Sequence, residues 1–593
     1  MMTSNEIPEL YHNPILPGFH PDPSICRAGE DYFIVNSSFA YFPGVPLFHS
    51  RDLVNWRQVG HCLTRPSQLP LEHARPSGGI FAPSIRFHEG TFYMITTNVT
   101  RGGNFYVTAR DPFGEWSDPV WLKQGGIDPS LLFDQGHVYM TSTGFSSSPE
   151  NPKARIPSIQ QSEIDIANGN LLTEPRPIWN GTGGSFPEGP HLYHIDGWYY
   201  LMIAEGGTEF GHTEVIARSR SPWGPFESCP NNPILTHRSY DSSIQALGHA
   251  DLVEAQDGSW WLVCLGIRTV GYPPAHHLGR ETFLAPVQWN ANGWPEVGLA
   301  GRIKMEMESP HLTPVKWAVP AERDDFDGTR LGLKWNFLGN PGSEDWSLTR
   351  QPGSLGLRGT PATLDDGLDI TFVGCRQEHF NVEIAAELNF DPAVDKEEAG
   401  LTVWMDERHH YEVFLSRVDG KRLAAVRRRI GSLAAVVAQE EIPAGPVTLR
   451  VRANQLFYAF SIETRGAGSH LLATGETRYL TTEVASGFTG VYFGLYASGS
   501  GQSAADWAFF DWFDYRSLDQ QKGLSIDSPL ADLFENDKAR AVLNKFLPEL
   551  TVNPFRDWPG SISLIGMEMM SPGGIAADKL LSIDDALREL PQD

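Results

Sequence analysis

Residues 22–36 of the chain read DPSICRAGEDYFIVN, and the pattern in this stretch decides the fold. An Asp-Pro-Ser element leads into a short apolar strand, a turn follows at Gly29, and a second strand is rich in aromatic and branched residues. The pattern recurs four more times within the first 270 residues. The five copies begin at Asp22, Ala82, Asp128, Glu188 and His249, which lie 60, 46, 60 and 61 positions apart.

The spacing of these copies predicts the architecture of the first half of the chain. Each interval has room for about four short strands, which is the content of one propeller blade. The turn glycine follows the first residue of every copy by seven to nine positions. A β-sandwich with coincidental hairpins would not keep this spacing, so it is the disfavoured alternative. We therefore predict a five-bladed β-propeller over residues 1–305.

The pattern stops after the propeller, and residues 306–323 are predicted to form a linker. Farther along, Val382, Ile384 and Ala386 alternate with polar or small residues. A period of two marks strands with one buried face. Several such strands predict an antiparallel β-sandwich over residues 324–518, so that the fold class is all-β.

The last part of the chain changes character again, and we predict a small α-helical appendage over residues 519–593. Ser528 followed by Pro529 is typical of a helix start. An amphipathic segment runs from Ser582 to Leu590. The appendage is expected to pack on the sandwich or to mediate self-association.

The composition narrows the classes of partner. The chain has 593 residues, with 46 Lys and Arg against 72 Asp and Glu, which leaves a net charge of −26. Such an acidic surface repels phosphate backbones and anionic lipids, so neither a nucleic acid nor a membrane is expected as a partner. The five cysteines never occur in CxxC spacing, which favours reduced thiols. Since no signal peptide or long apolar run is evident, we expect a cytoplasmic protein.

Three of the five first positions of the repeats carry an acid: Asp22, Asp128 and Glu188. Equivalent positions in propeller blades meet at one end of the central channel, so we expect three carboxylates around one axial pocket. Asp-Pro-Ser is also ordinary turn chemistry, and this simpler interpretation explains one copy well. Clustered carboxylates repel each other, so some of them should hold a proton. A protonated and an ionised carboxyl group together can act as the acid and base that cleave a glycosidic bond.

Eight ordered motifs carry a resemblance to a known family. They include HPDPS at 20–24, GIDPSLLFD at 126–134, SFPEGPHLY at 185–193, AEGGT at 204–208 and GRETF at 279–283. With these motifs the chain resembles glycoside hydrolase family 43, over residues 10 to about 515. It is most similar to the β-xylosidases and α-L-arabinofuranosidases that carry a C-terminal concanavalin-like sandwich. The resemblance implies a five-bladed propeller and hydrolysis by single displacement with inversion.

The resemblance also implies a role for each acid. Asp22 resembles the general base that activates water, and Glu188 resembles the general acid that protonates the leaving oxygen. Asp128 resembles the third carboxylate, which orients the acid and raises its pKa. Inversion needs room for a water molecule, so the base and the acid should lie ~6.5–9.5 Å apart. The positions that resemble the family's sugar-binding residues are Arg280, Phe39, Phe81, Ile127, Thr208 and His249.

Two of these positions depart from the pattern of the β-xylosidases, and a third is a candidate metal ligand. Relatives of the β-xylosidase type usually have Trp where Phe81 stands and Phe where Ile127 stands. A roomier pocket that accepts arabinofuranose would follow from both departures. The histidine at the position of His249 often lies beside Ca²⁺ in the family, although a buried histidine is more often simply hydrogen-bonded. Since Ca²⁺ prefers oxygen ligands, such an ion would keep mostly waters, and no cofactor is expected to be required.

The function predicted from the sequence is an exo-acting, inverting glycoside hydrolase. It would release xylose, arabinose or both from short xylo- or arabinoxylo-oligosaccharides, and a loop from the sandwich would narrow the mouth of its pocket. Two alternatives stay open: an endo-arabinanase and a non-catalytic carbohydrate-binding protein. A homo-oligomer is compatible with the resemblance, because relatives with this sandwich often form dimers or tetramers.

Overall fold

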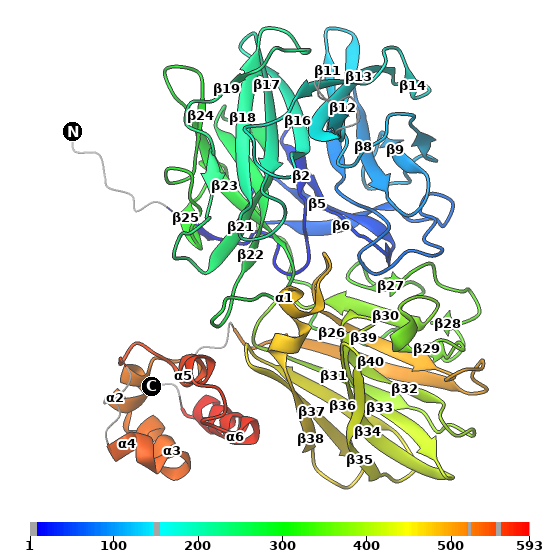
Figure 1. Ribbon diagram of the computed structural model, residues 1–593. Coiled ribbons are helices and arrows are strands. Elements are labelled where there is room, and N and C mark those ends of the chain that lie inside the picture. The colour runs from blue at the N-terminus through cyan, green and yellow to red at the C-terminus, as the bar shows by residue number, and fades with distance from the viewer. Residues whose placement is uncertain (1–8, 147–154, 520–522, 553–558, 592–593) are drawn as a thin grey trace.

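The computed structural model describes residues 9–146, 155–519, 523–552 and 559–591. Figure 1 shows a ring of radially arranged strands at the top, a layered set of strands below it, and a group of helices beside the lower set. The predicted all-β fold with a helical appendage is confirmed.

The upper part is a β-propeller made of five separate antiparallel sheets. Blade one contains β2 (Ser24–Ala28), β3 (Asp31–Val35), β5 (Gly44–Ser50) and β6 (Arg57–Leu63). Blade two contains β7 (Ser84–His88), β8 (Thr91–Asn98), β9 (Gly103–Ala109) and β10 (Val120–Trp121). Blade three contains β11 (Ser130–Asp134), β12 (His137–Ser146), β13 (Ile156–Asp165), β14 (Asn170–Leu171) and β15 (Arg176–Trp179).

The remaining two blades complete the ring. Blade four contains β16 (Glu188–Ile195), β17 (Trp198–Glu205), β18 (Thr213–Ser219), β19 (Glu227–Ser228) and β20 (Leu235–Thr236). Blade five contains β21 (Ile244–Glu254), β22 (Trp260–Arg268), β23 (Glu281–Trp289) and β24 (Pro295–Val297). Each repeated motif of the sequence forms the first hairpin of its blade, as in β2 and β3, which are joined through Gly29 at a φ of 68°.

The segment between the propeller and the sandwich is not irregular throughout. Within the predicted linker, β25 (Glu306–Glu308) pairs with β1 (Leu10–His12) near the start of the described chain. This pairing places the first strand and the end of the last blade side by side. β26 (Arg323–Asp324) then pairs with a strand of the sandwich.

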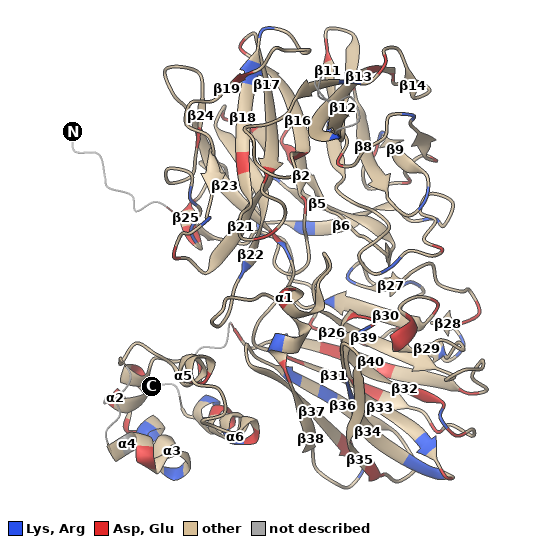
Figure 2. Cartoon of the chain, in the orientation of Figure 1, with Lys and Arg blue, Asp and Glu red and all other residues tan. Residues whose placement is uncertain are grey.

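The sandwich consists of two eight-stranded sheets, whose strands carry charged residues of both signs (Figure 2). The first sheet has the order β35 (Leu433–Glu441), β34 (Lys421–Ile430), β33 (His409–Val418), β32 (Glu398–Asp406), β39 (Tyr492–Ser498), β30 (Thr371–Arg376), β27 (Asn336–Leu338) and β4 (Tyr41–Phe42). The second has the order β28 (Trp346–Ser347), β29 (Leu355–Arg358), β40 (Trp507–Ser517), β31 (Val382–Asn389), β36 (Val447–Ala453), β37 (Phe457–Thr464) and β38 (His470–Glu476), with β26 beside β40.

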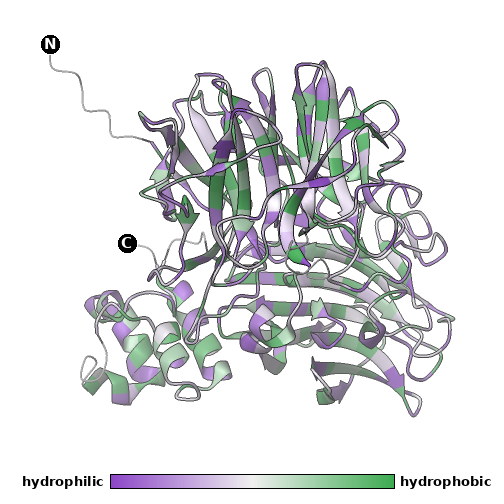
Figure 3. Cartoon of the chain, turned by 45° about the horizontal axis from the view of Figure 1, so that its top comes forward, coloured by the Kyte–Doolittle hydropathy of each residue, from purple (hydrophilic) through white to green (hydrophobic). Residues whose placement is uncertain are grey.

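The helical appendage has an apolar core of its own, visible as green faces turned inward in Figure 3. Its helices are α2 (Leu530–Glu535), α3 (Asp537–Phe546), α4 (Pro548–Val552), α5 (Leu564–Met570) and α6 (Ala577–Arg588). The same core includes Phe457 and Ala459 of β37, and Arg452 of β36 forms ion pairs with Asp584 and Asp585 of α6. The appendage therefore packs on the sandwich.

The predicted helix boundaries differ from the observed ones in detail. Pro529, not Ser528, is the N-cap of α2, and α6 begins five residues before Ser582. The N-cap of α6 is Ala576, whose side chain makes no capping hydrogen bond, so the sequence carries no start signal there. Within the described part of the chain, no helix is both long and apolar enough to cross a membrane.

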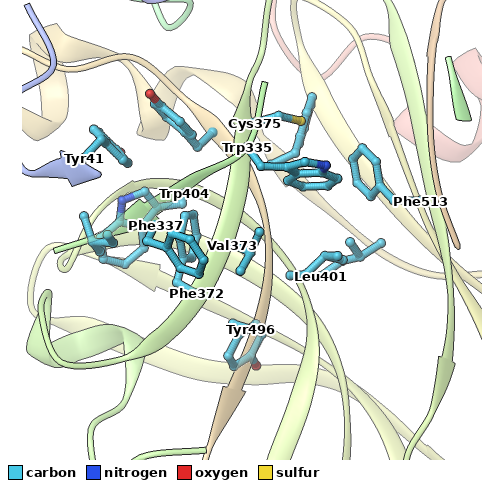
Figure 4. Packing of buried hydrophobic residues seen from close by; sticks show 14 of the residues in the cluster. Tyr41, Trp335, Phe337, Phe372, Val373, Cys375, Leu401, Trp404, Tyr496 and Phe513 are labelled. Carbon is cyan, nitrogen blue, oxygen red and sulfur yellow. The ribbon is translucent and has the colours of Figure 1, made fainter. Parts of the chain in front are cut away.

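The propeller and the sandwich share one continuous apolar core. β4 belongs to the first propeller segment, yet it pairs with β27 and so becomes an edge strand of the sandwich. The ring of Tyr41 in β4 stacks on Tyr492 of β39, with 4.0 Å between ring centroids. Figure 4 shows Tyr41 beside Trp404, Phe337 and other buried residues of the sandwich. This contact anchors the loops next to β4, which lead toward the propeller axis.

Candidate active site

The residues that begin the repeats occupy an unusual backbone conformation. Asp22, Asp128 and His249 have φ values of 52°, 54° and 51°, and Gly189, the residue after Glu188, has a φ of 57°. Residues other than glycine rarely adopt positive φ, and such strain is concentrated at functional sites. Four of the five blades therefore place a left-handed residue close to the acid or histidine at the repeat start, just before the innermost strand at Asp22 and Asp128 and within it at Gly189 and His249.

Asp22 is a buried carboxylate that the surrounding groups keep ionised. Its Oδ1 accepts a hydrogen bond of 2.7 Å from Arg280 Nη1, and its Oδ2 accepts one of 2.6 Å from Ser37 Oγ. Burial alone would raise the pKa of Asp22, but the charge of Arg280, the proximity of His249 and the Ser37 hydrogen bond together lower it. The expected position of Asp22 in the axial pocket agrees with this environment.

The environment of Glu188 raises the pKa of its carboxyl group instead of lowering it. It is partly exposed at the start of β16, and burial together with the negative charge of Asp22 raises its pKa to about 7, against an opposing effect of Arg280. Two carboxyl groups in one pocket therefore hold different protonation states near neutral pH. Asp22 carries the charge of a base, and Glu188 can hold the proton of an acid.

Asp128 lies beside Glu188 and accepts a hydrogen bond of 3.2 Å from the backbone amide of Gly189. Burial, followed by the charges of Glu188 and Asp22, raises the pKa of Asp128 well above its ordinary value. Asp128 thus contacts the backbone that carries Glu188. The resemblance implies that Asp128 orients the acid and raises its pKa, and this role stays a prediction.

Arg280 connects the propeller axis with the sandwich. Besides Asp22, it donates hydrogen bonds to Thr208 Oγ1 at 3.3 Å and to the backbone oxygen of Phe488 at 3.2 Å. Its guanidinium carbon also lies 5.8 Å from the ring centroid of Phe39 and 5.7 Å from that of Phe488. Arg280 and Thr208 therefore lie together beside Asp22.

Three phenylalanine rings form an aromatic wall next to Asp22 and Arg280. Phe39 lies 5.3 Å from Phe81 and 6.2 Å from Phe488, and Phe81 lies 6.0 Å from Phe488, measured between ring centroids. Phe488 comes from the sandwich loop after α1 (Thr482–Ala485), and its amide donates to Ser77 Oγ at 2.9 Å. Its side chain is 41% exposed, so the ring reaches the pocket without being enclosed.

Phe488 is the main functional residue that sequence reasoning missed. The sequence analysis expected a sandwich loop at the pocket but could not say which residue reaches it, because no spacing links residue 488 to the repeats. Of the other predicted positions, Ile127 directly precedes Asp128 and is partly exposed, as is Phe81. Phe81 and Ile127, the two departures from the β-xylosidase pattern, therefore both keep part of their surface exposed.

His249 lies beneath the acids. A Cβ atom added to Gly189 would come within 3.1 Å of its imidazole ring, so this glycine is required for the close approach. Burial and the charge of Arg280 lower the pKa of His249, which favours the neutral ring. Among the residues that the structure describes, no group of three or more His, Cys, Asp or Glu side chains is placed to hold a metal ion.

A buried charged network closes the axis below His249. Asp251 Oδ2 accepts hydrogen bonds from Arg86 Nη1 at 2.8 Å and from Ser24 Oγ at 2.6 Å, and its Oδ1 accepts one from the Tyr193 hydroxyl at 2.7 Å. Arg86 Nη2 lies 2.8 Å from Nδ1 of His191. These side chains come from blades one, two, four and five, so the network joins four blades directly under the catalytic pocket. Only Ser24 and Asp251 share a regular position, two residues after a repeat start, so the spacing of the repeats does not mark the network as a whole.

Comparison with known proteins agrees with this geometry. The sequence profile of "Glycosyl hydrolases family 43" matches residues 11–295, and that of the "Beta xylosidase C-terminal Concanavalin A-like domain" matches residues 323–516. The chain belongs to glycosyl hydrolases family 43. Membership of family 43 confirms the predicted class of enzyme, a glycoside hydrolase, and sets aside the alternative of a non-catalytic binding protein.

Relatives within family 43 match almost the whole propeller and sandwich. A Bacteroides ovatus protein named "Non-reducing end alpha-L-arabinofuranosidase BoGH43B" is 46% identical over 517 residues, covering 86% of this chain and 96% of its own. A "Xylosidase/arabinosidase" of Butyrivibrio fibrisolvens is 38% identical over 516 residues, covering 85% and 99% of the two chains. The solved structure named "Bacteroides ovatus Xyloglucan PUL GH43B" has a TM-score of 0.81 at 45% identity and covers 86% and 100%.

Proposed function

We propose that this family 43 enzyme is an exo-acting, inverting glycosidase that removes terminal arabinofuranosyl or xylosyl units from short oligosaccharides. The observation that carries the proposal is the opposite environment of two carboxyl groups in one pocket. Arg280 and Ser37 hold Asp22 in the ionised form, whereas burial and Asp22 raise the pKa of Glu188 to about 7.

In the proposed reaction, Asp22 accepts a proton from a water molecule, and the oxygen of that water bonds to the anomeric carbon. The bond between this carbon and the leaving oxygen breaks as Glu188 donates its proton to that oxygen. The configuration at the anomeric carbon is thereby inverted. Exchange of protons with solvent returns Asp22 to its ionised and Glu188 to its protonated state.

The other residues of the pocket would hold the sugar and the acid in place. Asp128 contacts the Gly189 amide and so orients the backbone of Glu188. Arg280 has donors directed at Asp22 and Thr208 and would also reach sugar hydroxyl groups. Phe39, Phe81 and Phe488 would cover an apolar face of the ring. Because Phe488 comes from another domain and narrows the pocket, it supports exo-action and disfavours an endo-arabinanase.

The choice between arabinofuranose and xylose follows from the space near two residues. Phe81 and Ile127 replace larger or flatter side chains of the β-xylosidase pattern, and both are partly exposed. The relative that is 46% identical is named for α-L-arabinofuranosidase activity, and the Butyrivibrio relative for both activities. We therefore expect arabinofuranosides to be the better substrates and xylosides to be accepted.

The proposal is tested with purified enzyme on nitrophenyl α-L-arabinofuranoside and nitrophenyl β-xyloside. Proton NMR of the first turnover products identifies the anomer, and an inverted anomer is expected. Asp22→Asn and Glu188→Gln are the informative variants, with Glu254→Gln as a matched control because Glu254 is an exposed acid at the end of β21. Wild-type activity of Asp22→Asn on these substrates, wild-type activity of Glu188→Gln on an arabinosyl- or xylosyl-oligosaccharide, or retained configuration in the product would contradict the proposed roles.

Self-association is a second part of the proposal and rests on the edge of the first sandwich sheet. Among the strands of the described residues, β35 pairs with β34 alone, and its Leu433, Val436 and Val437 are 74%, 49% and 42% exposed. An apolar edge strand with free backbone groups favours pairing with another chain. Light scattering should give the mass of an oligomer for the wild type and of a monomer for Val436→Lys. Equal masses would contradict this interface.

A cytoplasmic location remains part of the proposal as well. All five cysteines are buried and unpaired, which is typical of proteins in a reducing compartment. Fractionation of the producing cells would test it. A cofactor-free reaction is likewise proposed, and equal activity before and after treatment with a chelator is the expected result.

A further inference from the structure

One exposed aromatic side chain beside the acid is left unexplained by the catalytic mechanism. Phe186 precedes Glu188 by two positions, and 59% of its surface is exposed. Its φ is 52°, a conformation that is costly for a bulky residue. A surface ring held at the cost of backbone strain, directly before the acid, points to a role in binding.

The segment that carries Phe186 is fixed to the propeller from beneath. Glu205, which is only 3% exposed, accepts hydrogen bonds from both the amide and the hydroxyl of Thr182, at 2.6 and 2.5 Å. The amide of Gly206 donates to the backbone oxygen of Ser185 at 2.7 Å. The loop is therefore bound to the end of β17 at two points, Thr182 and Ser185, the second of which directly precedes Phe186.

Two glycines allow this loop to lie directly on Glu205. A Cβ atom at Gly181 would come within 1.9 Å of a Glu205 carboxylate oxygen, and one at Gly184 within 2.7 Å. No larger residue could take either position without moving the loop. The buried carboxylate thus holds a loop whose main exposed feature is the Phe186 ring.

The position of the ring relative to the pocket follows from its contact with Gly207. A Cβ atom at Gly207 would lie 3.1 Å from Cδ2 of Phe186, so the ring rests against this backbone. The next residue is Thr208, whose hydroxyl accepts from Arg280 at 3.3 Å. The ring therefore borders the pocket at the wall that contains Glu188 and Thr208.

We propose that Phe186 forms the platform for the leaving sugar, a pyranose ring of the oligosaccharide. This inference rests on the proposed role of Glu188. An acid that protonates the leaving oxygen must lie within hydrogen-bond reach of it, so the sugar that departs is brought against the residues flanking Glu188. The exposed face of Phe186 covers the apolar C–H face of that sugar, as aromatic side chains do in binding sites with one wet and one apolar side.

The platform predicts an effect that depends on the leaving group. Phe186→Asn removes the ring, and asparagine tolerates positive φ, so the loop keeps its conformation. This variant should lower kcat/KM about ten-fold on an arabinosyl- or xylosyl-oligosaccharide, whose leaving group is a sugar. On arabinofuranosyl fluoride or xylosyl fluoride, which leave only fluoride, it should stay within about two-fold of the wild type. Phe186→Tyr should restore oligosaccharide activity.

Two controls complete the experiment. Leu172→Asn changes another exposed apolar residue of the propeller, 60% exposed, and should affect neither substrate. Thr182→Ala keeps the ring but removes one hydrogen bond to Glu205, and should produce a smaller loss confined to the oligosaccharide. An equal loss on both substrates in Phe186→Asn, or no loss on the oligosaccharide, would overturn the platform. Failure of the proposed function is distinguishable, since Glu188→Gln would then hydrolyse the oligosaccharide at the wild-type rate.

Discussion

The propeller axis and the first sheet of the sandwich both bury several acids, but they treat them differently. In the sandwich, Arg427 donates to Glu398 at 2.6 Å and to Glu412 at 3.1 Å, and His410 lies 3.1 Å from Glu412. Each buried acid there faces a nearby cation. In the pocket at the propeller axis, Arg280 pairs with Asp22, whereas Glu188 has no cation within hydrogen-bond distance among the described residues. Asp251, below the pocket, is paired with Arg86.

The sandwich acids are paired with cations and stabilise the fold, whereas the acids of the pocket are arranged so that one of them can exchange a proton. In the sandwich, the acids raise the pKa of His410 to about 9 and favour its charged form. In the pocket, burial and the negative charge of Asp22 raise the pKa of Glu188 to about 7, where a proton can be both held and released. A buried acid is thus available for catalysis because it is left incompletely paired.

The largest expected effect comes from removing the unpaired acid. Glu188→Gln should lower kcat on an oligosaccharide by roughly 10²–10⁴-fold, because general acid catalysis contributes about that much. The loss should be much smaller on a nitrophenyl glycoside, since nitrophenolate leaves without needing a proton. Steady-state rates on both substrates check this, with Glu254→Gln as control. An equal loss on both substrates would contradict the assignment of the acid.

The second-largest effect is expected from breaking the ion pairs of Arg427 with Glu398 and Glu412 in the sandwich. Arg427→Met leaves Glu398 and Glu412 buried without their guanidinium, which should reduce the stability of the sandwich by roughly 3–5 kcal/mol. Thermal unfolding measures the loss. The matched control is Arg516→Met, because Arg516 pairs with Glu383 at 2.8 Å on the surface and should contribute no more than about 1 kcal/mol. Similar shifts in both variants would show that the cluster adds nothing beyond a surface pair.

A third effect concerns the pH dependence of stability. The pKa of folded His410, about 9, lies above its ordinary value of 6.5, because Glu412 and Asp365 outweigh the effect of burial. Its contribution is therefore fully present below pH 6.5 and is lost as the pH rises through 9, by up to about 3 kcal/mol. Unfolding at pH 6 and pH 9.5 should show this loss in the wild type and less of it in His410→Gln. His12→Gln, at an exposed histidine, should behave as the wild type.

The smallest effect is the pH dependence of the reaction itself. Glu188 must be protonated to act as an acid, so the rate should fall about ten-fold per pH unit above pH 7. Asp22 must be ionised, and since Arg280, His249 and Ser37 lower its pKa, the acidic limb should lie below the range in which an ordinary aspartate titrates. Rates of the wild type from pH 3 to pH 9 give both limbs. A basic limb that persists in Glu188→Gln would assign it to another group.

Much of the fold and of the catalytic centre could be predicted from local patterns. The five hairpins and the strand alternation are properties of short stretches, so the propeller and the sandwich were accessible. Asp22, Asp128 and Glu188 were found because they hold equivalent places in a repeat that closes on itself. Phe488, Phe186 and β4 had no such marker, because each acts through a neighbour that is far away in the sequence or through an uncommon backbone conformation.

By itself, the sequence determined the architecture, the family and the three acids at the axis, because repeats and motifs are local patterns that can be recognised without a structure. Only the tertiary structure decided which acid is charged and which is protonated, and which parts of the sandwich complete the pocket. A pKa depends on burial and on charges brought close by folding, and Arg280 lies 258 positions from Asp22 in the chain. The protonation states of the acids in this enzyme therefore depend on contacts between segments that lie far apart in the sequence.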